Sequence, residues 1–259
     1  MHSPPTYQET TSAQAALQPS HELVIAIDFG TTFTGVAYAW CVPGQTRIDT
    51  LVENITVVKH WPFSSFAGSN EKIPTVLSFS KSPPLWGGYV QKYHTEKARN
   101  FKLGLQKNLE SHYHSDSPLF ELSKLGLFNE SPSQEECSAP SGKSPVDLSA
   151  EFLKRVLEYV QEIYIPKELS ATFFSKFGPK VSYILTVPAI WNDDAKDLTR
   201  QAASRAGIPD DKLELITEPE AAALFCATKN PQLNLNPGDC FMVCDAGGGT
   251  VVCISLLCV

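Results

Sequence analysis

The sequence contains no cluster of lysine and arginine residues, and this absence restricts the partners that it can bind through charge. Its 21 basic residues are outnumbered by 28 acidic ones, so the formal net charge is −7. Proteins that bind nucleic acid through phosphate contacts present a basic patch or stripe. We therefore expect no nucleic-acid partner. Any phosphate bound here must be held locally, by backbone amides and a metal ion.

Long apolar runs are missing as well. No stretch of about 18 apolar residues occurs, and the N-terminus lacks the basic start and apolar core of a signal peptide. The seven cysteines are an odd number, and most lie in apolar runs. Cys240 and Cys244 have neither CxxC spacing nor a nearby histidine, so a zinc site is not expected. We expect no membrane partner and a cytoplasmic protein whose thiols are free rather than paired in disulfides.

The order of the predicted elements indicates an α/β protein behind a polar tail. Residues 1–21 are rich in proline, serine, threonine and glutamine, which predicts a disordered tail. Apolar strand patterns then alternate with helical ones, as in layered α/β folds, and the strand–turn–strand pattern at 23–40 predicts a mixed sheet. Strands are predicted at 23–27, 34–40, 75–79, 181–187, 213–216 and 240–244, helices at 145–164, 193–206 and 221–228, a weakly helical segment at 89–110, and a surface insertion at about 113–145.

The predicted helices begin and end at recognisable capping residues. Ser144 precedes a proline and an acidic residue three positions on, and Thr217 stands three residues before Glu220, which is the capping-box pattern. Asn192 is expected to cap the next helix, and Gly207 to end it.

One pattern occurs twice, each time directly after an apolar strand: an aspartate, then glycine, then threonine. It is IDFGTT at 27–32 and CDAGGGT at 244–250. Glycine permits close backbone approach and lets several N–H groups point at one anion, and the threonine hydroxyls add donors. The aspartates would repel a phosphate that lay directly against them. A hydrated Mg²⁺ between carboxylate and phosphate makes the interaction attractive instead. Two facing loops would clamp the tail of a nucleoside triphosphate, whereas two ordinary glycine turns are the alternative that the repetition disfavours.

These loops and two segments between them resemble the heat-shock branch of the superfamily of ATPases that also contains actin and hexokinase. DFGTTFTGVAY, from residue 28, is similar to its first phosphate motif, and CDAGGGT to its second. YILTVPAIW at 183–191 and LITEPEAAA at 215–223 resemble the seventy-kilodalton heat-shock proteins, most of all their divergent twelfth subfamily. The resemblance implies an α/β, actin-like (ribonuclease H-like) ATPase fold with a mixed sheet and flanking helices.

The resemblance also implies roles for individual residues. Asp28 and Asp245 would bind Mg²⁺ through water, and Asp245, Glu218 and Lys102 would form the catalytic group. Glu218 is equally explained as an acidic residue that stabilises the first turn of its own helix, and Lys102 as an exposed surface lysine. The phosphates of ATP or ADP would be held by Gly30, Thr31, Thr32, Gly247, Gly248, Gly249 and Thr250.

The function that the resemblance implies is slow hydrolysis of ATP, by in-line attack of water on the γ-phosphate. Nucleotide would be the ligand, and co-chaperones or client proteins the partners. One alternative is a non-catalytic fragment or pseudo-ATPase that acts as an interaction module. Another is a sugar or glycerol kinase of the same superfamily, which the heat-shock-like segment TEPEAAA at 217–223 disfavours.

The resemblance fails near the C-terminus. Val252 stands where the family carries a further aspartate, and the sequence stops at Val259. We therefore expect a complete first lobe over 22–236, the start of a second lobe over 237–259, and the rest of the second lobe missing. One hypothesis is that 252–259 is translated intron sequence, because splice donors and valine codons begin with the same two bases. A genuine apolar last strand is the alternative.

Overall fold

The computed structural model describes residues 22–41, 55–63, 71–90, 97–106, 142–168, 180–230, 236–247 and 251–257. Several expectations fall elsewhere. The predicted tail at 1–21, nearly all of the predicted insertion at 113–145, and the phosphate-loop residues Gly248, Gly249 and Thr250 lie outside the described residues.

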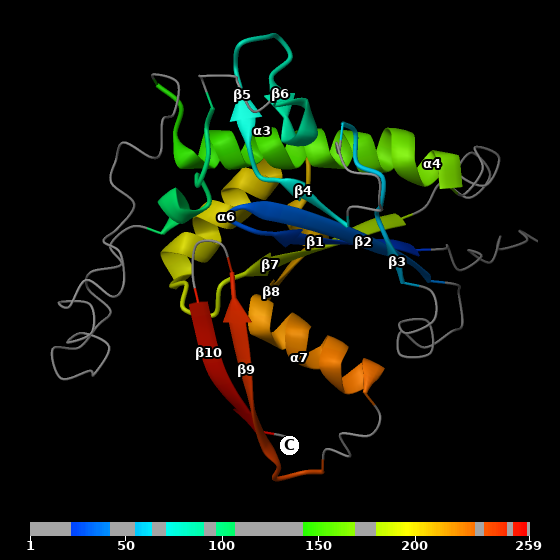
Figure 1. The fold of residues 1–259 in the computed structure, drawn as a ribbon, viewed down its shortest axis with the longest axis vertical. Helices are drawn as coiled ribbons and strands as arrows, with labels where there is room; N and C mark the ends of the chain where they lie inside the picture. The colour runs from blue at the N-terminus through cyan, green and yellow to red at the C-terminus, as the bar shows by residue number, and fades with distance from the viewer. Residues whose placement is uncertain are drawn as a thin grey trace, which may run out of the picture.

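A mixed sheet forms the centre of the fold (Figure 1). The first two strands run antiparallel, with Asp28 opposite Gly35, as the strand–turn–strand pattern predicted. The first strand also pairs in parallel with a strand much later in the chain, with Glu22 opposite Lys180, and that strand pairs in parallel with the next. In spatial order the strands are β3 (Thr56–Val57), β2 (Phe33–Cys41), β1 (Glu22–Phe29), β7 (Lys180–Val187) and β8 (Leu213–Thr217), and β4 (Lys72–Pro74) also pairs with β2.

Helices flank this sheet because each has an apolar face to bury. The longest, α3 (Pro145–Glu158), continues through a π-helix (Tyr159–Tyr164) into α4 (Ile165–Glu168). Helix α3 buries Phe152, Leu153 and other apolar side chains and packs against α6 (Asp193–Arg205). In Figure 1 it lies on the opposite side of the sheet from α7 (Glu218–Lys229). None of the helices in the described parts of the chain is long and apolar enough to span a membrane.

The capping predictions are confirmed. The Ser144 hydroxyl accepts a hydrogen bond from the backbone N–H of Asp147, and the Asp147 carboxylate accepts one from the backbone N–H of Ser144. Asn192 caps α6 through its side-chain oxygen, and the helix ends at Gly207, whose φ of 99° is in the left-handed region that favours glycine.

Two predicted elements differ from the structure. The strand predicted at 75–79 is shorter than expected, because only Leu77–Ser78 (β5) is a strand, and it pairs with Leu85–Trp86 (β6) in a separate two-stranded sheet. Within the weakly helical segment predicted at 89–110, the described residues 97–106 hold only a short 3-10 turn, Leu103–Leu105. Ala98 instead forms a β-bridge with Leu77, and Asn100 has a φ of 57°, which an α-helix does not permit.

The last described elements form an antiparallel hairpin, β9 (Cys240–Ala246) and β10 (Val251–Leu257). The apolar segment near the C-terminus is therefore a strand in this structure. Asp245 lies in β9 directly opposite Val252 in β10. The hairpin packs against α7 (Figure 1).

The register of this hairpin predicts a specific thiol reaction. Cys244 and Cys253 are opposite one another, both are exposed, and their sulfur atoms are 3.1 Å apart. Directly opposed residues in antiparallel strands have the Cα separation that a disulfide requires. We expect oxidised glutathione to join these two cysteines, with the loss of two hydrogen atoms and release of two molecules of reduced glutathione.

Peptide mapping by mass spectrometry measures this cross-link. Cys226 and Cys240 are also free and exposed, so they provide an internal comparison. A cross-link from Cys253 to either of them in preference to Cys244 would contradict the register of β10.

Candidate functional site

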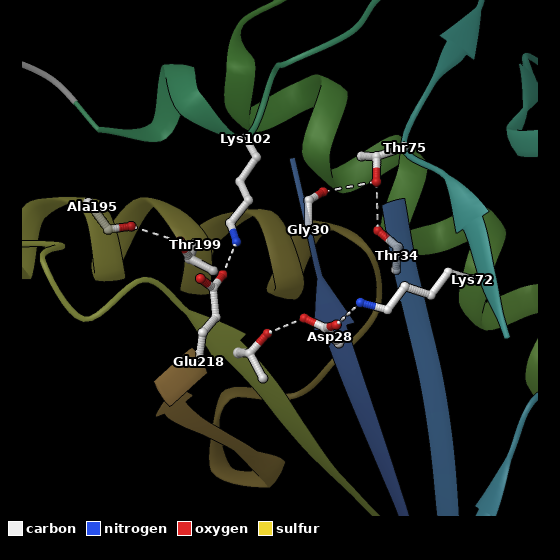
Figure 2. A network of polar contacts seen from close by, with 10 residues as sticks. Asp28, Gly30, Thr34, Lys72, Thr75, Lys102, Ala195, Thr199 and Glu218 are labelled. Carbon is white, nitrogen blue, oxygen red and sulfur yellow. Dashed lines mark hydrogen bonds and ion pairs between the residues drawn. The ribbon is translucent and has the colours of Figure 1, made fainter. Parts of the chain in front are cut away.

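The turn that follows β1 is held in place by Thr75. The Thr75 hydroxyl donates to the Gly30 carbonyl oxygen (2.9 Å), and the Thr75 backbone N–H donates to the Thr32 carbonyl oxygen (2.8 Å). A 2.8 Å hydrogen bond between the hydroxyls of Thr34 and Thr75 fixes the Thr75 side chain (Figure 2). The backbone N–H groups of Thr31 and Thr32 make no hydrogen bond to the described residues. Two carbonyls of the turn are thus engaged and two amides stay available to an anion.

Gly30 is required in this turn for steric reasons. A Cβ atom at this position would lie 2.1 Å from the carbonyl oxygen of Phe33. That oxygen belongs to the backbone, so no side-chain rotation can relieve the overlap. This contact within the chain explains the glycine, and the close approach of Gly30 to a phosphate stays a prediction.

The carboxylate of Asp28 lies at the end of β1 with two partners (Figure 2). Its Oδ1 atom accepts a hydrogen bond from the Thr186 hydroxyl (3.2 Å), and its Oδ2 atom contacts the Lys72 ammonium (2.8 Å). Both side chains of the ion pair are about half exposed. Sequence analysis missed Lys72, Thr75 and Thr186, because they reach the turn only through the pairing of β4 with β2 and of β7 with β1.

Lys102 and Glu218 form a second ion pair, in which Lys102 is buried and Glu218 is largely buried. The Nζ atom of Lys102 lies 2.5 Å from Oε1 of Glu218, with side chains 2% and 14% exposed. The ammonium group also lies 5.6 Å from the ring centre of Phe29 and 5.5 Å from that of Trp191. The interpretation of Lys102 as an exposed surface lysine is therefore wrong.

Glu218 is the first residue of α7, but the capping box of this helix is formed by Thr217 and Glu220. The Glu220 carboxylate accepts hydrogen bonds from the backbone N–H (2.9 Å) and the hydroxyl (2.7 Å) of Thr217. These bonds lower the pKa of Glu220, with the backbone bond the larger cause. The Glu218 carboxylate is consequently free to point toward Lys102 (Figure 2).

The two ion pairs lie on either side of one residue. Phe29 follows Asp28 in the sequence, precedes Gly30, and places its ring beside the Lys102 ammonium. The structure thus brings together the turn at Asp28–Thr32 and the predicted catalytic pair (Figure 2). The amides of the turn can bind anionic oxygen atoms, whereas each ammonium group is already paired with a carboxylate and would contact an anion only in competition with Asp28 or Glu218.

Asp245 lies in β9, and Gly247 directly follows that strand. No hydrogen bond or ion pair within the described part of the chain joins either of them to Asp28, Lys102 or Glu218. Among the same residues, no group of three or more histidine, cysteine, aspartate or glutamate side chains could hold a metal ion. The assignment of Asp28 and Asp245 to one metal site remains a prediction.

Most of the sequence is similar to the sequences of several known heat-shock and chaperone proteins. No protein-family model matches the sequence. The chain is 32% identical over 231 residues to heat shock 70 kDa protein 12A of Homo sapiens and 27% identical over 235 residues to heat shock 70 kDa protein 12B of the same species. It is 23% identical over 237 residues to the chaperone protein HscA homolog of Acinetobacter baumannii. The chain is therefore homologous to the seventy-kilodalton heat-shock proteins.

This homology confirms the resemblance that the motifs indicated. The aligned residues make up 86%, 86% and 92% of this chain in the three comparisons. They make up 31%, 30% and 33% of the relatives, so the chain spans about a third of the length of these heat-shock proteins. The mixed sheet with flanking helices is compatible with an actin-like ATPase fold.

Proposed function

We propose that this chain is a heat-shock-type ATPase domain that binds ATP with Mg²⁺ and hydrolyses it slowly. The observation that carries the proposal is the buried Lys102–Glu218 pair beside the turn at Asp28–Thr32. Burial of an ion pair is costly, and its position next to a turn with free amides supports a functional reason for it. The division into a first lobe over 22–236 and the start of a second over 237–259, and a partnership with co-chaperones or client proteins, are parts of the same proposal.

The residues of the turn fit a phosphate group. Phosphate oxygens would accept hydrogen bonds from the amides of Thr31 and Thr32, in the turn that Gly30 permits. The predicted loop from Gly247 to Thr250 would contribute further amides. Asp28 and Asp245 would hold Mg²⁺ through water, and the ion would supply charge neutralisation for the phosphates. Lys102 would contact the terminal phosphate, and Glu218 would orient the attacking water.

Calorimetric titration with Mg-ATP tests this proposal directly. We expect micromolar binding and protection of the chain from limited proteolysis, because nucleotide binds only the folded protein. Asp28→Asn should weaken the Mg²⁺-dependent binding by about tenfold, a change of about 1.4 kcal/mol. Asp211→Asn removes one negative charge from an exposed residue of the turn before β8 and serves as the matched control.

Phosphate release over hours then measures hydrolysis. Absence of binding by the folded, unmodified chain would contradict the proposal. Equal weakening by Asp28→Asn and Asp211→Asn would contradict the role of Asp28.

A second candidate function is that of a non-catalytic interaction module. The observation in its favour is that Val252, opposite Asp245, replaces the further carboxylate that the resemblance leads one to expect. An apolar side chain there removes one water-binding group from the metal site. Binding of nucleotide without phosphate release, in the same experiments, would favour this function.

A further inference from the structure

A cavity of about 330 Å³ is lined by residues of the β5–β6 hairpin, of α3 and of the π-helix. Its helical wall is formed by residues 155, 158, 159, 162 and 163, which recur at the spacing of one helical face. None of the residues discussed above for nucleotide binding contributes to it. We name it the aromatic groove and define it by Trp86, Tyr89, Tyr159, Glu158, Glu162 and Ile163.

The floor of the aromatic groove consists of rings that the core holds in place. The ring of Trp86 lies 6.0 Å from that of Tyr89 and 6.0 Å from that of Tyr159. Trp86 is nearly buried and packs edge-on against Phe152 of the core at 6.5 Å. The Tyr159 hydroxyl donates to the His60 carbonyl oxygen (3.1 Å), which fixes its ring. The faces of such rings attract cations electrostatically.

The charges at the rim of the groove favour a cation as well. Of its ionisable side chains other than tyrosine, two are carboxylates and one is Arg155. The Arg155 guanidinium is already neutralised, because it contacts Glu151 at 2.7 Å and Glu158 at 2.9 Å. Glu162 is exposed and forms no ion pair with the described residues. An anionic ligand would be repelled here, and a wholly apolar ligand would leave the Glu162 carboxylate covered and unpaired.

Apolar surface continues beyond the rings. Ile163 is 57% exposed at one edge of the groove, and Tyr89 is 36% exposed at another. Pro84 and Leu85 complete the wall that the hairpin contributes. A ligand that filled the groove would therefore place a cation over the rings, near Glu162, and apolar groups on either side of it.

We propose that the aromatic groove binds a peptide segment that carries an arginine or lysine side chain between apolar residues. The cationic head lies against Trp86, Tyr89 and Tyr159 and pairs with Glu162, while the flanking side chains cover Ile163 and Leu85. The cavity volume is at the lower end of the range for ligand sites, which suits one long side chain and its neighbours. This inference does not depend on nucleotide binding.

Calorimetry with short peptides tests it. The probes are the acetylated and amidated peptides Ala-Leu-Arg-Leu-Ala, its lysine counterpart, and its citrulline counterpart, which keeps the shape of arginine without the charge. We expect the citrulline peptide to bind about tenfold more weakly than the arginine peptide. Glu162→Gln should weaken the arginine peptide about fivefold, because a charge-assisted hydrogen bond becomes a neutral one.

The control variant is Asp211→Asn, which removes the same charge from an exposed residue that does not line the groove. It should leave the affinity unchanged, and the ratio of the arginine to the lysine peptide identifies the preferred cation. Equal affinity for the arginine and citrulline peptides would overturn the proposal. So would tighter binding of a pentaproline peptide, or equal effects of Glu162→Gln and Asp211→Asn.

Discussion

Replacing Lys102 with methionine is expected to lower the free energy of unfolding by about 3 kcal/mol, because it leaves the buried Glu218 carboxylate without its partner. Methionine retains an apolar stem that can pack near Phe29 and Trp191, so the loss reflects the charge more than the volume. The double variant Lys102→Met with Glu218→Leu should recover much of the loss, because neither charge is then buried.

Urea unfolding followed by circular dichroism measures these differences. The matched comparison is Lys72→Met, which breaks the half-exposed ion pair with Asp28. That change should cost less than about 1 kcal/mol, because water screens exposed pairs. If Lys102→Met were no more destabilising than Lys72→Met, the burial of the Lys102–Glu218 pair would be wrong. Phosphate release by the folded Lys102→Met protein then tests its proposed catalytic role.

The second large effect is expected for Gly30→Ala. The added methyl group would lie 2.1 Å from the Phe33 carbonyl oxygen, so the turn must open. Such an overlap costs about 1–3 kcal/mol of stability. It also displaces the amides of Thr31 and Thr32, and we expect binding of Mg-ATP to fall by more than about tenfold, beyond what the loss of stability explains.

Gly35→Ala provides the control for this change. Gly35 lies opposite Asp28 in the same sheet, and a methyl group there first meets the Lys72 side chain at 3.4 Å. This is ordinary van der Waals contact, so binding and stability should change little. A Gly30→Ala protein with unchanged nucleotide affinity would show that the turn does not receive phosphate. Calorimetry and thermal unfolding of both variants provide the two readouts.

Structural features that depend on residues close together in the sequence could be predicted from the sequence alone. The caps at Ser144, Asn192 and Thr217 and the end of α6 at Gly207 follow from interactions within four residues, and all are confirmed. The same holds for the turn between the first two strands, which pair in the antiparallel arrangement that was predicted. The resemblance to heat-shock proteins likewise rested on short motifs that occur in order along a single sequence, and the homology confirms it.

Features that depend on distant segments could not be predicted in this way. The burial of Lys102 results from its packing against Phe29, Trp191 and Glu218, which lie far from it in the sequence. The pattern at 75–79 is apolar enough for a strand, but Thr75 bonds to the turn after β1, and only Leu77–Ser78 forms the strand. No local pattern marks such long-range hydrogen bonds.

The ion pair between Lys72 and Asp28 has a consequence for ion selectivity. Lys72 acts as a tethered monovalent competitor, because its ammonium occupies an oxygen of the carboxylate that a hydrated divalent ion would approach. If Asp28 holds the proposed Mg²⁺, the ion would compete with Lys72 for this oxygen, and a displaced Lys72 would be available to another anion. A bound triphosphate would provide one, so metal and nucleotide are expected to enter together rather than in sequence.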